Sequence, residues 1–417
     1  MVLGTSFFYF FQMLNNWPRV LMFIWENSRA SQITQMVIDV EILSSSLNLH
    51  HNRLINSPTD FEQFYGLKNI SSCVFSAPPN ATYHWQHFFE GEKLSNLQTK
   101  TCYVTLRCVK EGTHTVHLSV TNSRGEIISA GSKTFESHPR WVAIVGDSFA
   151  SGEGNPDVQQ REDHRAQWLD GRCHRSGKSF AAQVFREIQS VKQDLYLTYL
   201  ACAGATVESG LLKVKGQLSQ LDVLESISTM RGRGPDIAIL TAGGNDIGFS
   251  DIINSLLHES SKAVVGLLDM RFFFVSHLLD NVAERFNALG ARNIFVPQYF
   301  DFTKNERGEV DASCLAYGEM TTSSMMFAER AILRRLNQLL LKKGAQHGWR
   351  VASTIPGLFA RAGICSSHSF IRTREESLAL QGDPFGAFHP SEEGHRAVAE
   401  ELIKLLKKSG TLESLLQ

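Results

Sequence analysis

The pattern of hydrophobic and polar positions changes near residue 139, from strands alone to strands that alternate with helices. Between about residues 61 and 138, short runs of β-branched and aromatic residues are separated by turn residues, as is typical of an all-β module. The clearest run covers residues 113–121, where Val116, Leu118 and Val120 recur at every second position and therefore share one face of a strand.

From residue 139 onward, helical periods such as residues 179–190 and 326–341 lie between short apolar runs, and a terminal helix begins near residue 391. The apolar runs are typical of strands buried on both faces, and they cover residues 141–145, 195–200, 236–241, 293–296 and 350–354. Such alternation predicts a five-stranded parallel sheet with helices on both faces. Ligands bind to such sheets beyond the carboxyl ends of the strands.

Composition adds a domain estimate and excludes some partners. The 417 residues include 41 Lys+Arg and 42 Asp+Glu, a formal net charge of −1, with no long basic run. This balance argues against nucleic acid or an anionic membrane as the main partner, and it gives no indication of the oligomeric state. We divide the chain into an N-terminal segment (1–60), a β-sandwich-like module (61–138) and an α/β domain (139–417).

The cysteines indicate an oxidising compartment. Seven are present, and no two form a C-x-x-C pair that would suggest a zinc or redox motif. Their wide scatter suits long-range disulfides, and the three in the β module allow one bridge with one thiol left over. Two glycosylation sequons, at Asn69 and Asn80, agree with a secreted or lumenal location.

The N-terminal segment leaves three interpretations open. Apolar patches at residues 7–11 and 20–25 are separated by polar residues and a proline, so neither reaches the roughly 20 residues that span a bilayer. No basic residue precedes the first patch, as a secretory signal would require. A degenerate signal, a membrane-lying anchor and a mis-assigned start are the alternatives. Residues 26–60 show no strong period and are predicted to be irregular.

Four residues at strand or helix ends could carry chemistry. Ser148 follows a buried strand in a glycine- and serine-rich loop, and Gly204 follows the next strand, where the ordinary interpretation is a turn. Asn245 follows two glycines and could instead cap a helix, a role also open to Asp246. His389 lies just before the terminal helix. Each signal is weak by itself, but their order along the chain is specific.

Together these positions resemble the four blocks of the SGNH (GDSL-type) hydrolase family, over roughly residues 139–410. The strings around them, including Gly-Asp-Ser, Gly-Gly-Asn-Asp-Ile-Gly-Phe and Phe-His-Pro, are similar to the secreted scab-esterase-like branch. The resemblance implies a three-layer α/β/α flavodoxin-like domain. It also implies two disulfides, Cys173 with Cys202 and Cys314 with Cys365. The preceding β module resembles PKD- or immunoglobulin-like domains in texture.

The resemblance further implies a serine hydrolase mechanism. His389 would act as base for the Ser148 hydroxyl, and the oxyanion would be held by the Ser148 and Gly204 N–H groups and the Asn245 amide. Many family members carry an aspartate three residues before the histidine, but Gly386 stands there in this chain. Either Asp383 or a backbone carbonyl is then left to orient His389.

The expected function is a secreted serine esterase or lipase that hydrolyses carboxylic esters of lipids or other acyl compounds. The alternatives are a carbohydrate O-acetyl esterase and an inactive binding protein whose β module contacts a surface or a glycan. We expect no metal or organic cofactor: His389 and His395, with Glu392 and Glu393, do not follow the H-E-x-x-H spacing. No G-x-S-x-G motif surrounds Ser148, which argues against an α/β-hydrolase.

Overall fold

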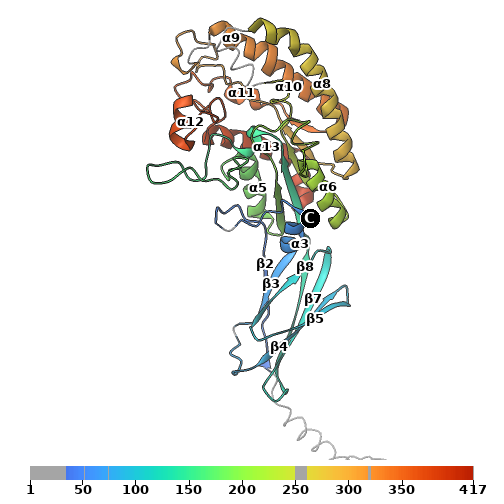
Figure 1. The fold of residues 1–417 in the computed structure, drawn as a ribbon. Helices are drawn as coiled ribbons and strands as arrows, with labels where there is room; N and C mark the ends of the chain where they lie inside the picture. The colour runs from blue at the N-terminus through green and yellow to red at the C-terminus, as the bar shows by residue number, and fades with distance from the viewer. Residues whose placement is uncertain (1–33, 51, 74, 249–260, 318–320, 417) are drawn as a thin grey trace, which may run out of the picture. The chain divides into compact units, whose positions relative to one another are not determined.

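The computed structural model describes residues 34–50, 52–73, 75–248, 261–317 and 321–416, which form two compact units (Figure 1). The first unit comprises residues 34–42 and 67–138, and the second comprises residues 43–66 and 139–416. The first 25 residues, with their three open interpretations, lie outside the described residues. Among the described residues, no helix combines the length and apolar character needed to cross a membrane.

The first unit consists of two β-sheets that share one apolar core (Figure 1). One sheet has the order β1-β8-β7-β4-β5 and the other the order β2-β3-β6, and all pairs are antiparallel except β1 with β8. Val116, Leu118 and Val120 are buried on one face, as their spacing predicts. The strands are β1 (Thr34–Gln35), β2 (Asp39–Ile42), β3 (Leu67–Ser71), β4 (Thr82–Phe89), β5 (Glu92–Thr99), β6 (Tyr103–Arg107), β7 (Gly112–Thr121) and β8 (Ile127–Ser137).

The second unit contains a five-stranded sheet in which every pair is parallel, with the order β10-β9-β11-β12-β13. Most side chains of these strands are buried, because helices cover both faces and leave no side of the sheet in water. This confirms the predicted α/β fold with small β-sheets before it. The strands are β9 (Arg140–Val145), β10 (Leu195–Tyr199), β11 (Ile237–Leu240), β12 (Ile294–Pro297) and β13 (Arg350–Ala352).

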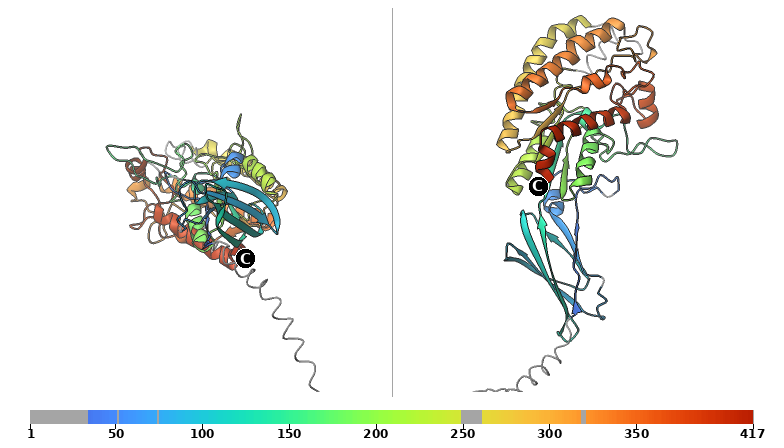
Figure 2. Two further views of the ribbon diagram at one scale, coloured as in Figure 1. Left: turned by 90° about the horizontal axis from the view of Figure 1, so that it is seen from below. Right: turned by 180° about the vertical axis from the view of Figure 1, so that it is seen from behind.

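In the second unit, a helix near the C-terminus packs beside the helix that connects β9 to β10. Helices α5 and α13 pack together on one face of the sheet and α6 lies on the other (Figures 1 and 2). Within the described residues the helices are α3 (Pro58–Phe64), α4 (Ser148–Ser151), α5 (Phe180–Val191), α6 (Gln220–Arg231), α8 (Ser261–Ala288), α9 (Thr322–Phe327), α10 (Arg334–His347), α11 (Ile355–Phe359), α12 (Arg374–Gln381), α13 (Glu392–Lys408) and α14 (Thr411–Leu416), with a 3₁₀ turn η1 (Leu315–Tyr317) and a π-helical segment η2 (Ala328–Leu333).

The prediction that residues 26–60 are irregular is wrong in part, because β1, β2 and the start of α3 fall within them. Residues 43–66 also pack along β10, which is an edge strand of the parallel sheet. Ile55 donates its N–H to the Leu197 carbonyl at 2.8 Å, and the Tyr199 N–H donates to Asn56 Oδ1 at 2.8 Å. The segment therefore satisfies backbone groups that an uncovered edge strand would expose.

The described part of the chain contains three disulfides, and two of them are the pairs that the family resemblance implies. The third lies in the β module, where three cysteines allow one bridge. It joins Cys73 to Cys102, and Cys108 takes no part in a disulfide. The disulfides join Cys73 to Cys102, Cys173 to Cys202 and Cys314 to Cys365. Of the two sequons, Asn80 is exposed at a turn and Asn69 is half-buried in β3, and their glycosylation stays a prediction.

Candidate active site

The turn between β9 and α4 presents the Ser148 hydroxyl at the carboxyl end of the sheet. Gly146 has φ +141°, and a Cβ atom there would lie 2.2 Å from Thr241 Oγ1, so only glycine fits without displacing a neighbouring strand. The Gln220 side chain accepts from the Gly146 N–H at 2.7 Å and donates to its carbonyl at 2.9 Å. These bonds fix the turn that aims Ser148.

A buried carboxylate caps α4 directly beneath the nucleophile. Asp147 Oδ1 accepts from the Phe149 N–H at 3.1 Å and from the Thr241 hydroxyl at 2.8 Å. Its other oxygen accepts a hydrogen bond from the Tyr299 hydroxyl. Burial raises the pKa of the Asp147 carboxyl, and the hydrogen bonds from Tyr299 and Thr241 partly offset this effect. The cap holds the first turn of α4, and with it Ser148, in one orientation.

The structure brings His389 to Ser148 from the far end of the chain. His389 Nε2 lies 2.8 Å from Ser148 Oγ, and Nδ1 lies 3.2 Å from the Ala387 carbonyl oxygen. When Nδ1–H donates to that carbonyl, Nε2 carries the lone pair that can accept the serine proton. Arg372 holds this segment through two backbone bonds, one to the His389 carbonyl and one from the Phe388 N–H.

Asp383, the acid that the sequence offers as third member, is engaged elsewhere. Its Oδ1 accepts from the Gln381 amide at 2.6 Å and from the Phe385 N–H at 2.9 Å. The group within hydrogen-bond distance of His389 Nδ1 is the Ala387 carbonyl. The geometry therefore agrees with the second alternative from the sequence, in which a backbone carbonyl orients the imidazole.

We expect Asp383→Asn to keep kcat/KM for ester hydrolysis within about tenfold of wild type, because it is the Ala387 carbonyl that lies within hydrogen-bond distance of His389 Nδ1. If the Asp383 carboxylate oriented the histidine instead, its removal would cost about 10⁴-fold. The amide oxygen of the variant still accepts from Gln381 and Phe385, so folding is preserved. The measurement is kcat/KM across pH, with melting temperature as the folding control. A loss near 10⁴-fold with an unchanged melting temperature would assign the orienting role to Asp383.

Two loops at the same end of the sheet carry the other predicted residues. Asn245 donates one amide N–H to the Ala205 carbonyl at 2.9 Å, which leaves the second hydrogen of its amide group available to a ligand. Gly204, one residue earlier on that loop, has φ +76° and is exposed. Asp246 accepts from the Val207 N–H at 2.9 Å, and burial raises the pKa of this carboxyl to about 6.

A disulfide tethers the Gly204 loop. Cys202, two residues before Gly204, is bonded to Cys173, and the Ala203 N–H donates to the Cys173 carbonyl at 3.1 Å. Arg175 donates from Nε to the Ala201 carbonyl at 2.9 Å. These contacts restrict the backbone from which the Gly204 N–H would donate.

Two hollows of different character adjoin these residues. The first contains Ser148 and His389 and is otherwise lined mainly by apolar side chains, among them Phe149, Phe300, Leu333, Leu336 and Phe388. Leu333 ends η2, a π-helical segment of the kind often found at functional sites. The second contains Gly204 and is more polar, with lining residues that include Asp170, Arg172, Arg175 and Gln217.

A buried polar network, which the sequence analysis missed, links the nucleophile loop to the segment before His389. Glu153 accepts from His174 Nδ1 at 2.8 Å and from the Gln381 amide at 2.8 Å. His174 stacks on Trp168 with 4.5 Å between ring centroids, and the hydrogen bond to Glu153 raises its pKa. Although burial favours the neutral acid, the hydrogen bond from His174 and nearby positive charge lower the pKa of Glu153. The sequence contained one indication of this network, because His174 lies in the Cys-His-Arg-Ser string at residues 173–176.

Residues 144–397 match the model of the GDSL-like Lipase/Acylhydrolase family, which is more than half of the chain. Because the match covers more than half of the chain, the chain belongs to this family of ester hydrolases.

Named relatives are bacterial. A lipase of Streptomyces rimosus is 25% identical over 259 residues, which cover 61% of this chain and 81% of the relative. The crystal structure of the extracellular lipase from that organism aligns with a TM-score of 0.47 and 22% identity, covering 64% of this chain and 99% of the lipase. Phospholipase A1 from Streptomyces albidoflavus NA297 aligns with the same TM-score and identity, covering 65% of this chain and 99% of the phospholipase.

Proposed function

We propose that the protein is a secreted serine esterase or lipase that forms an acyl-enzyme on Ser148, with His389 as the base. The observation that carries the proposal is the 2.8 Å contact between Ser148 Oγ and His389 Nε2, beside a hollow lined by apolar side chains. Three disulfides support export to an oxidising compartment. Export would agree with the extracellular lipase among the similar structures.

The proposed reaction has two halves. His389 takes the Ser148 proton as the hydroxyl attacks the ester carbonyl, and the protonated imidazole then gives that proton to the departing alcohol. Water, activated by the same imidazole, attacks the acyl-enzyme and releases the carboxylic acid and the free serine. The Ser148 and Gly204 N–H groups and the Asn245 amide would stabilise the negative oxygen of both tetrahedral intermediates.

The two hollows suggest how the ester is oriented. Phe300, Leu333 and Leu336 form an apolar wall next to Ser148, which suits an acyl chain longer than acetyl. Arg172, Arg175 and Gln217 line the hollow on the Gly204 side, which suits a polar alcohol group. A lipid-like acyl ester with a polar head fits both, and the polar hollow is the observation that keeps an acylated carbohydrate as the second candidate.

A series of p-nitrophenyl esters from acetyl to palmitoyl tests this proposal. We expect kcat/KM to peak beyond acetyl, and Leu336→Trp, which narrows the apolar hollow, to lower kcat/KM for long esters at least about tenfold while sparing acetyl. Leu341→Trp is the matched control, because Leu341 lies on the same helix, α10, with 43% of its surface exposed.

Two other outcomes of the ester series would contradict part of the proposal. Hydrolysis confined to the acetyl ester would identify a short-chain esterase and favour the carbohydrate O-acetyl alternative. No hydrolysis of any ester, together with no labelling of Ser148 by a phosphonate probe, would leave an inactive binding protein.

A further inference from the structure

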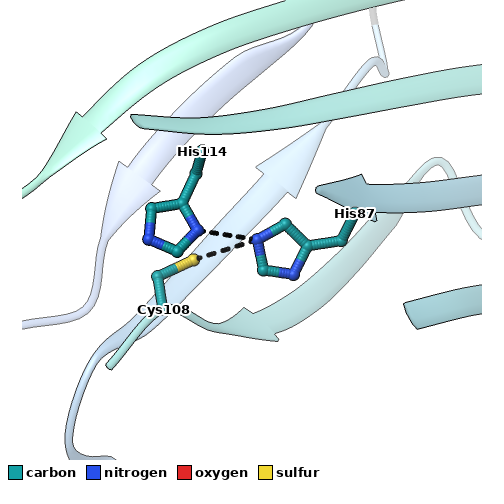
Figure 3. A group of neighbouring side chains, drawn as sticks. All are labelled: His87, Cys108 and His114. Atoms are coloured by element: carbon teal, nitrogen blue, oxygen red, sulfur yellow. Dashed lines mark hydrogen bonds between the residues drawn. The ribbon is translucent and has the colours of Figure 1, made fainter. Parts of the chain in front are cut away.

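Three potential metal ligands meet inside the β module, which belongs to a different unit from the residues that the proposed function uses. His87 lies on β4 and His114 on β7, which are paired strands of the five-stranded sheet, and Cys108 follows β6 of the facing three-stranded sheet. Figure 3 shows that both rings and the sulfur point toward one another. The group therefore spans the two sheets.

The distances suit a single metal ion. His87 Nε2 lies 2.9 Å from His114 Nδ1 and 3.8 Å from Cys108 Sγ, and the three ligand atoms all lie within 4.8 Å of one another. Metal–nitrogen bonds of about 2.0 Å and a metal–sulfur bond of about 2.3 Å would place two nitrogens about 3.3–3.5 Å apart and a nitrogen and sulfur about 3.5–3.7 Å apart. Small side-chain rotations would bring the three atoms to that geometry.

The ring of His114 is already oriented for coordination. Its Nε2 lies 3.0 Å from the Lys110 carbonyl oxygen, so Nε2–H donates there and Nδ1 presents its lone pair toward His87. A hydrogen bond from the far ring nitrogen to a carbonyl is the arrangement that fixes metal-binding histidines in the required tautomer.

The three side chains lie in the interior of the β module. His87 and His114 lie on the inner faces of their strands, where neighbouring positions hold Trp85, Val116 and Leu118. His87 is 3% exposed, and His114 and Cys108 are 0% exposed. The two rings hydrogen-bond to each other, and His114 also bonds to the Lys110 carbonyl. Together with the Cys108 sulfur they form a buried group of potential ligands inside an apolar core.

We propose that His87, Cys108 and His114 bind one Cu(I) ion between the two sheets. Thiolate is a soft ligand that selects cations such as Cu(I), and imidazole also suits copper. One thiolate and two neutral imidazoles form a neutral complex with Cu(I), which suits an apolar interior, whereas Zn²⁺ would leave a net positive charge there. Structural zinc sites also use four ligands, whereas this cluster offers three, His87, Cys108 and His114, among the described residues.

Binding requires one proton to leave. The Cys108 thiol loses its proton to solvent as the sulfur–copper bond forms, and the proton on His87 Nε2 is replaced by one on Nδ1, so the ring stays neutral. No electron transfer is involved, because the ion arrives and remains as Cu(I).

The test is an anaerobic Cu(I) titration of the full chain against a chromogenic Cu(I) chelator such as bicinchoninate. We expect wild type to retain one Cu(I) per chain, and Cys108→Ser and His114→Gln each to weaken binding at least about 100-fold. His117→Gln is the matched control, because His117 lies on the same strand as His114 but is exposed. This control should bind Cu(I) as wild type does.

X-ray absorption of the copper-loaded wild-type protein gives a readout that does not depend on how the variants fold. One sulfur and two nitrogen neighbours around copper would support the site. The proposal fails if the chelator removes all copper from wild type, if Cys108→Ser binds as tightly as wild type, or if the protein selects Zn²⁺ over Cu(I). Because the ester hydrolysis site is in the other unit, none of these results bears on the proposed enzymatic function.

Discussion

Replacing Ser148 with alanine is expected to lower kcat/KM for ester hydrolysis by about 10⁴-fold or more and to abolish labelling by a phosphonate probe. The physical reason is that Ser148 Oγ is the atom that His389 Nε2 contacts at 2.8 Å, and without it no acyl-enzyme can form. His389→Ala should cost a similar factor, and the double variant should lose little more than either single variant, since the two groups act as one unit.

The measurement is kcat/KM on the preferred p-nitrophenyl ester, with Ser367→Ala as the control, because Ser367 is exposed in the same unit. Residual hydrolysis within tenfold of wild type in Ser148→Ala, with normal folding, would remove the nucleophile assignment. Fully additive losses in the double variant would show that serine and histidine contribute independently.

The second large effect is expected at Asn245. Asn245→Ala should lower kcat by about 10²- to 10³-fold with little change in KM, because an oxyanion donor acts mainly in the transition state. Asn245→Asp should lose at least as much, since a carboxylate keeps the shape but offers no N–H and adds repulsion toward the oxyanion. Steady-state kinetics on one ester separate kcat from KM.

Asn287→Ala serves as the control, because Asn287 is exposed near the end of α8. The Asn245 variants also lose or alter the bond to the Ala205 carbonyl, so melting temperature must be compared with wild type. A rise in KM with unchanged kcat would make Asn245 a ground-state binding residue and would leave the oxyanion to the backbone groups.

The parallel sheet could be predicted closely from the sequence because its strands are short apolar runs that end at glycine or polar residues. The run at residues 141–145 became β9 (Arg140–Val145), and the run at residues 293–296 became β12 (Ile294–Pro297). The strands β1 and β2 were missed because they have two and four residues and depend on pairing with distant β8 and β3. Such short segments carry too little periodicity to be recognised.

The site residues could be predicted only where side chains form a recognisable string. Ser148 and His389 stand in such strings, and the structure places them in contact. The Ala387 carbonyl could not be foreseen as the partner of Nδ1, because every residue carries a carbonyl and only the backbone path selects one. The contact between Glu153 and Gln381 joins residues 228 positions apart, which no local pattern encodes.

The bond between Cys173 and Cys202 has a practical consequence for producing the protein. It restrains the backbone beside Gly204, and a preparation made in a reducing cytosol would lack this restraint. Expression through an export pathway, or refolding with a glutathione redox buffer, is therefore the appropriate starting point for assays. An assay of cytosolic material should therefore be repeated on protein in which the bond between Cys173 and Cys202 has formed.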